Sequence, residues 1–342
     1  MKTSPRVPAG SAFRPSTARH FFGCAALILT TASAFANLNI VENFATDPLG
    51  PGRWSFGVGS NVNTQFVHQG SAPAFPGDTA GSLAVHFDSS LPTARIDLGL
   101  GTTLTDTDSF TISAQFSFAV NYASPDQTMQ IAFGLVNHSL TGGDRTGSGS
   151  NFSSDNVFHT VEFDYYPNET FFGGPTLTPT VFGAQKAGSD AFGNTATIFG
   201  SGSDLGSNTT GITELPQNVN LQATLTYLGG TRQLSLEIAQ IDPVTGQLTV
   251  LVTGVPTLNL LDPPAFGAGY DPVAPFLVDS LAIMAYHDGF TTPADPSLVA
   301  DVVFQKFTVT SSVPEPTTSL LLAGALLGWA CRRSRGEPCT PR

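Results

Sequence analysis

Short stretches in which apolar and small polar residues alternate recur through most of the chain. Residues 109–120 (SFTISAQFSFAV) place Phe110, Ile112 and Phe116 on one face, with small polar residues between them. A period of two is typical of a β-strand with one buried face, and residues 37–312 show no sustained helical period. The same pattern predicts five further strands: residues 218–228, 231–241, 246–252, 280–286 and 300–310.

These strands predict how the chain packs. A strand with one apolar face buries that face against a second layer, so the series favours two antiparallel sheets packed face to face. Gly229 and Gly230 separate two of the strands and predict a hairpin. No proline-rich spacer divides the region, so residues 37–312 are expected to form one all-β domain.

The beginning of the chain has the pattern of an export signal. Arg14 and Arg19 precede a short apolar run that ends in small residues, including Ala34 and Ala36. A basic flank, an apolar run and a small-x-small site predict a secretory signal peptide over residues 1–36, cut after Ala36 by signal peptidase, with a cut after Ala34 as the alternative site. An N-terminal membrane anchor is the alternative.

A second targeting pattern stands near the C-terminus. It consists of a Pro-Glu-Pro segment, a short apolar stretch and an arginine pair: Val313, Pro314, Glu315, Pro316, residues 317–331, Arg332 and Arg333. As a helix the apolar stretch would span about 22 Å, less than the ~30 Å of a hydrocarbon core. The stretch therefore favours a transient anchor over a permanent membrane span.

The order of these three parts resembles the PEP-CTERM sorting signal of Gram-negative bacteria, which an exosortase recognises. The resemblance implies that residues 313–342 are a sorting segment, held briefly in the inner membrane before the protein reaches the cell surface or extracellular matrix. Species with such signals generally make exopolysaccharide and form biofilms. A tail-anchored helix without sorting is the alternative.

Composition excludes several classes of function. The chain has 14 Lys and Arg against 26 Asp and Glu, a formal net charge of −12, which argues against a nucleic-acid partner. Its three cysteines, Cys24, Cys331 and Cys339, all lie in the two end segments. Thiol catalysis, cysteine metal sites and disulfides are therefore excluded for residues 37–312.

Candidate metal chemistry gathers in residues 158–170 (FHTVEFDYYPNET). On a strand Glu162 and Asp164 project from the same face, because side chains alternate. With the carbonyl of Tyr166 and the amide of Asn168 they form an oxygen ligand set of the kind that Ca²⁺ takes. The alternative is that both carboxylates are solvated on the outer face of the strand.

This segment resembles the metal-binding strand of the legume (L-type) lectins, E-x-D-x-[aromatic]-x-N. Residues 109–118, 221–238 and 302–310 are similar to further lectin strands in the same order. The resemblance implies a concanavalin A-like β-sandwich, or jelly roll. It also implies Glu162 and Asp164 as ligands of a transition metal and calcium, with the Tyr166 carbonyl and Asn168 on calcium.

The sequence departs from the lectin pattern after Asn168. The lectins have a further Asp and a His there, whereas this chain has Gly173 and Gly174 and no His before His287. The lectins' sugar-binding Asp is also missing, with Gln130 at roughly its place. Calcium is therefore the expected cofactor, and no transition metal is expected.

Sandwich glucanases offer an enzymatic reading of the same strand, since their signature is E-x-D-x-(x)-E. The second Glu would stand at Tyr166 or Pro167, and Glu169 comes too late. The histidines His138, His159 and His287 are isolated and are expected to be surface or hydrogen-bonded core residues rather than ligands. A non-enzymatic protein is therefore predicted.

Together these patterns predict an exported surface or matrix protein that binds exopolysaccharide. The predicted sugar contacts follow the metal strand: Asn168, Phe171 and Phe172. The alternatives are a structural matrix or biofilm protein without sugar binding and a degenerate glycoside hydrolase.

Overall fold

The computed structural model describes twelve segments of the chain: residues 35–56, 66–70, 81–88, 94–123, 129–141, 158–166, 176–184, 195–197, 215–252, 258–262, 272–287 and 298–314. They lie within one compact unit, Phe35–Pro316. Within them the one helix is α2 (His138–Thr141), and no described helix is long and apolar enough to cross a membrane.

The first sheet, here sheet A, has nine strands. Its order is β13-β12-β11-β6-β16-β4-β3, with β1 also on β16 and β14 also on β12. All of its pairs are antiparallel. Its strands are β1 (Phe35–Glu42), β3 (Phe66–Gln69), β4 (Ser82–Asp88), β6 (Phe110–Ala123), β11 (Leu221–Leu228), β12 (Gln233–Ile241), β13 (Leu248–Val252), β14 (Leu258–Asn259) and β16 (Leu298–Pro314).

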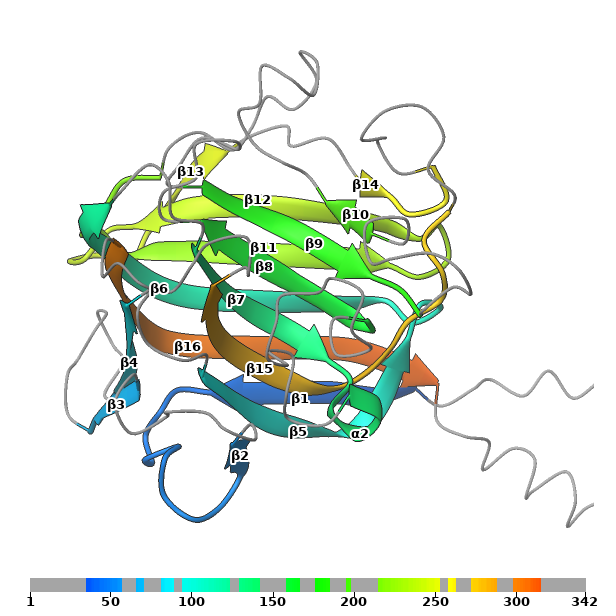
Figure 1. Ribbon diagram of the computed structural model, residues 1–342. Coiled ribbons are helices and arrows are strands. Elements are labelled where there is room, and N and C mark those ends of the chain that lie inside the picture. The colour runs from blue at the N-terminus through cyan, green and yellow to red at the C-terminus, as the bar shows by residue number, and fades with distance from the viewer. Residues whose placement is uncertain are drawn as a thin grey trace, which may run out of the picture. The chain divides into compact units, whose positions relative to one another are not determined.

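The second sheet, sheet B, has seven strands in the order β10-β9-β8-β7-β15-β5-β2, again all antiparallel. Figure 1 shows β8, β7, β15 and β5 in a layer in front of β11, β6 and β16. Its strands are β2 (Trp54–Phe56), β5 (Ala94–Thr105), β7 (Met129–Val136), β8 (Thr160–Tyr166), β9 (Thr176–Phe182), β10 (Thr195–Thr197) and β15 (Leu277–His287).

Aromatic side chains fill the space between the sheets. Phe133 of sheet B contacts Phe116 and Phe304 of sheet A, with ring centroids 5.4 and 5.1 Å apart. Phe118 of sheet A and Tyr165 of sheet B approach to 4.4 Å. All five side chains are buried, so aromatic contacts hold the two layers together.

The predicted architecture is confirmed: the described chain is almost entirely β, in two antiparallel sheets. The predicted hairpin at Gly229-Gly230 joins β11 to β12. Each of the six predicted strands is present, with bounds that differ by a few residues at the ends.

The two predicted end boundaries fall inside paired strands. β1 pairs with β16 from Phe35 opposite Pro314 to Glu42 opposite Phe307. A cut after Ala36 would therefore remove the first residues of β1, and a sorting segment that begins at Val313 overlaps the end of β16. Residues 1–34, including Ala34, and residues 315–342 lie outside the described residues, and the domain boundaries stay predictions.

His159 lies directly before β8, and its ring is half-buried. Its backbone has φ of 59°, its Nδ1 accepts a hydrogen bond from the Leu277 amide at 3.1 Å, and burial lowers its pKa below 6.5. Because the folded protein holds this ring neutral, the unfolded chain takes up the proton first as the pH falls. We expect the free energy of unfolding to fall as the pH decreases through about 6.5.

The variant His159→Asn tests this expectation, because Asn tolerates positive φ and keeps an acceptor. Denaturant unfolding of both proteins at several pH values should show a weaker decrease for the variant. Equal pH dependence in the two proteins would contradict the assignment to His159.

Candidate functional site

β8 places two acidic side chains on the outer face of sheet B. Val161, Phe163 and Tyr165 point into the core, whereas Glu162 and Asp164 project from the opposite face. Glu162 is 0% and Asp164 2% exposed. The predicted alternation along this strand is confirmed. The alternative in which both carboxylates are solvated is wrong, because both are buried.

Small and apolar side chains lie next to the two carboxylates. In β7, Gly134 is opposite Glu162 and Ala132 is opposite Asp164. The next strand, β15, continues these two rows with Ala282 and Met284, and the side chains of this region are fully buried. We call these four positions the central strip: Ala132, Gly134, Ala282 and Met284.

A buried ion pair lies beyond the central strip, on β5. Arg95 is opposite Met284 and Asp97 is opposite Ala282, and the Arg95 Nε donates to Asp97 Oδ1 at 2.7 Å. Three strand spacings, about 14 Å, separate β5 from β8. Both residues are 1% exposed, and within the described chain the two Nη atoms of Arg95 have no hydrogen-bond partner.

His138 contacts the second oxygen of Asp97. Its Nδ1 lies 2.8 Å from Asp97 Oδ2, and its side chain is 37% exposed against 1% for Asp97. The amides of His138 and Ser139 donate to the Asp279 carboxylate at 2.8 and 3.1 Å. Burial raises the pKa of Asp279, but hydrogen bonds from the Ser139 and Ser280 side chains and from the His138 and Ser139 amides outweigh it, so the pKa lies below its usual value. Asp97 therefore links Arg95 and His138 by hydrogen bonds on this face of sheet B.

Two of the four predicted metal ligands are described with their side chains, Glu162 and Asp164. Tyr166 ends β8, paired with Thr176, and Asn168 lies outside the described residues, as do Phe171 and Phe172. No three His, Cys, Asp or Glu side chains in the described segments gather closely enough to hold a metal. The donor set that is described fits a hard cation such as Ca²⁺, because it consists of carboxylate oxygens on one face.

The sequence interpretation missed Arg95 and Asp97. The signal was present, since they alternate with Ile96, Leu98 and Leu100 of the core in the way that Glu162 and Asp164 alternate with their core neighbours. His138 and His159 both make hydrogen bonds, as expected. The side chain of His287 is not described.

The C-terminal segment contains the sorting signal of the protein. Residues 312–335 match the PEP-CTERM protein-sorting motif. The chain carries a PEP-CTERM signal. The match contains the six predicted sorting residues, Val313, Pro314, Glu315, Pro316, Arg332 and Arg333. The signal implies export, with a membrane-associated sorting step and processing by an exosortase, as the sequence predicted.

Several solved structures are similar to this chain, among them legume lectins. Peanut lectin matches with a TM-score of 0.41 and 9% identity over 81% of this chain and 97% of its own. Lectin II from Ulex europaeus gives 0.38 and 14% over 81% and 99%. A carbohydrate esterase of bacteriophage phi24B gives 0.38 and 11% over 81% and 99%. These similarities are too distant to support an argument about binding or catalysis, and no curated protein matches the chain.

Proposed function

We propose that this PEP-CTERM protein is a non-enzymatic, lectin-like protein of the cell surface or extracellular matrix that binds exopolysaccharide with the help of Ca²⁺. The observation that carries the proposal is the burial of Glu162 and Asp164 side by side on one face of sheet B. Two carboxylates held side by side on one face of a strand offer oxygen ligands of the kind that Ca²⁺ takes.

Within this proposal the residues after β8 complete the site. The carbonyl of Tyr166 and the side chain of Asn168 would join Glu162 and Asp164 as oxygen ligands. Asn168, Phe171 and Phe172 would contact the sugar. A sugar hydroxyl would then meet polar and aromatic side chains next to the Ca²⁺.

The enzymatic alternative requires a second carboxylate close to the first pair. In the described chain the next buried acid on this face is Asp97, about three strand spacings or 14 Å from β8, and it is occupied by Arg95 and His138. A retaining glycosidase needs its two carboxyl groups about 5 Å apart. Asp97 is therefore too far away to be the second catalytic carboxylate, and we keep the proposal of a binding protein.

Thermal unfolding of the full chain with excess Ca²⁺ or with EDTA tests the metal. At a concentration 100-fold above Kd, a ligand of the folded state stabilises it by about 2.7 kcal/mol, which raises the Tm by roughly 5–10 °C in a domain of this size. The double variant Glu162→Gln/Asp164→Asn should lose this shift. Asp301→Asn, an exposed acid of sheet A, is the matched control and should keep it.

A glycan array with the host's exopolysaccharide, with Ca²⁺ or EDTA, tests the sugar. Saturable binding that needs Ca²⁺ and that EDTA and the double variant both weaken would support the proposal. A Ca²⁺-dependent rise in Tm without any sugar binding would favour a structural matrix protein instead. Turnover of a β-glucan that Glu162→Gln abolishes would show a hydrolase instead.

A further inference from the structure

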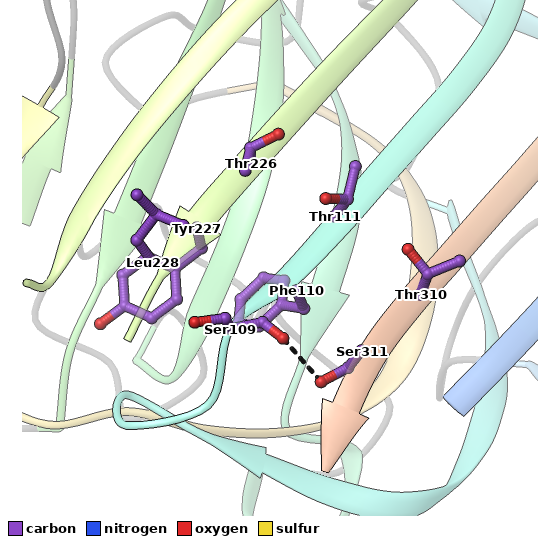
Figure 2. A pocket seen from close by; sticks show the side chains of 8 residues that line it. All are labelled: Ser109, Phe110, Thr111, Thr226, Tyr227, Leu228, Thr310 and Ser311. Atoms are coloured by element: carbon purple, nitrogen blue, oxygen red, sulfur yellow. Dashed lines mark hydrogen bonds between the residues drawn. The ribbon is translucent and has the colours of Figure 1, made fainter. Parts of the chain in front are cut away.

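A groove of about 320 Å³ opens on the outer face of sheet A, far from the carboxylates of sheet B in the sandwich. Figure 2 shows that side chains from β6, β11 and β16 surround it. Three of them are threonines, and Ser109, Ser311 and Leu228 lie at one end. Six of the eight residues that line the groove therefore carry a hydroxyl group.

The three threonines form a single row across neighbouring strands. Thr226 is opposite Thr111, and Thr111 is opposite Thr310, so that the members of this threonine row stand about 4.8 Å apart. Figure 2 shows them side by side. Ser235 of β12 and Asn39 of β1 extend the row by one strand on each side.

The hydroxyls of the threonine row are available to a ligand. Ser311 Oγ donates to the Ser109 carbonyl at 2.8 Å, and Ser109 Oγ accepts from the Gly229 amide at 3.1 Å. The hydroxyls of the row make no comparable bond within the described chain. Each can donate one hydrogen bond and accept others.

The groove carries no charge. Its lining contains no acid, lysine, arginine or histidine, and the side chain of Tyr227 points into the core, where its hydroxyl donates to the Asp106 carbonyl at 2.6 Å. Burial raises the pKa of Tyr227 to about 12, so the phenol stays neutral. Asp106 is itself paired with Arg232 at 3.2 Å. In a chain of net charge −12, this surface suits an uncharged ligand.

We propose that the threonine row is a second carbohydrate site, one that binds a neutral polysaccharide chain. Sugar hydroxyls match the row because they too both donate and accept hydrogen bonds. A sugar chain that runs across the strands would meet one threonine on each of β11, β6 and β16. Leu228, 48% exposed, would contact the apolar C–H groups of a sugar ring.

This site does not depend on the calcium site, because the two lie on the opposite outer faces of one sandwich. A single molecule with both sites could hold two polysaccharide chains at once. Linked sites raise the overall binding strength beyond that of either alone. The protein would then cross-link matrix polymers as well as bind them.

Isothermal titration of the full chain with neutral cello-, malto- and xylo-oligosaccharides in EDTA tests the proposal. The triple variant Thr111→Val/Thr226→Val/Thr310→Val keeps the β-branched shape and removes only the hydroxyls. Three lost hydrogen bonds, each worth about 0.5–1.5 kcal/mol, predict at least a tenfold weaker affinity. The single variant Thr111→Val, which disturbs folding least, should weaken binding by a smaller factor.

The controls separate this site from the first. Thr249→Val on β13 should bind the neutral sugar like the wild type, and EDTA in all titrations removes any contribution of the calcium site. The proposal is overturned if the wild type binds none of the sugars, or if a folded triple variant binds as well as the wild type. Sedimentation that shows a dimer lost in the triple variant would overturn it too, because the row would then be an interface between copies of the chain.

Discussion

Replacing Asp97 by alanine is expected to lower the free energy of unfolding by about 3–5 kcal/mol, because it leaves a buried charge without its partner. Asp97 accepts from the Arg95 Nε at 2.7 Å and contacts the His138 Nδ1 at 2.8 Å. Its removal leaves the guanidinium of Arg95, already without partners at both Nη atoms within the described chain, with none at Nε. Denaturant unfolding of Asp97→Ala measures the effect.

A second His–Asp pair of the protein provides the matched control. His86 Nδ1 lies 2.7 Å from Asp301 Oδ1, but the two side chains are 43% and 41% exposed. Because exposed pairs contribute about 0–1 kcal/mol, Asp301→Ala should have little effect. The double variant Arg95→Met/Asp97→Leu should recover much of the stability, since it removes both charges. Equal losses for Asp97→Ala and Asp301→Ala would contradict the argument.

The alternation of apolar and polar residues was enough to predict the strands and the two sheets. In β6 and β11 each apolar residue of the pattern is buried, so the local sequence already encodes which face meets the core. The ends of the strands were harder to predict from the sequence. β1 and β16 come from opposite ends of the domain and pair along their whole overlap, from Phe35 opposite Pro314 to Glu42 opposite Phe307. The signal-peptide and sorting patterns in the sequence do not show where this pairing ends.

The site was predictable only where its residues are close in sequence. Glu162 and Asp164 share a face by the two-residue period alone, and that much was predicted. Their neighbours Gly134 and Ala282, and the pair Asp97 and His138, come together through the register of four strands. No spacing in the sequence fixes that register. For the same reason the threonine row, whose members come from three separate strands, had no local signal.

The register also makes Gly134 the most sensitive position next to the candidate calcium site. A Cβ at this position would lie 2.5 Å from both the Cα of Glu162 and the carbonyl oxygen of Val161. Those atoms belong to the β8 backbone, so the strand itself would have to move. We expect Gly134→Ala to destabilise the protein by about 1–3 kcal/mol, as overpacking does, and to displace Glu162.

Gly99 on β5 is the matched control, because a Cβ there would meet nothing within 4 Å. Gly99→Ala should be neutral or stabilise the protein by up to about 1 kcal/mol, since alanine restricts the unfolded chain. If β8 holds Ca²⁺, Gly134→Ala should also lose part of the Ca²⁺-dependent rise in Tm, whereas Gly99→Ala should keep it. A loss of stability with an unchanged Ca²⁺ shift would show that Gly134 serves packing and that Glu162 is not a ligand. The stability of Gly134→Ala and its response to Ca²⁺ thus distinguish the packing of Gly134 against β8 from the placement of Glu162 as a Ca²⁺ ligand.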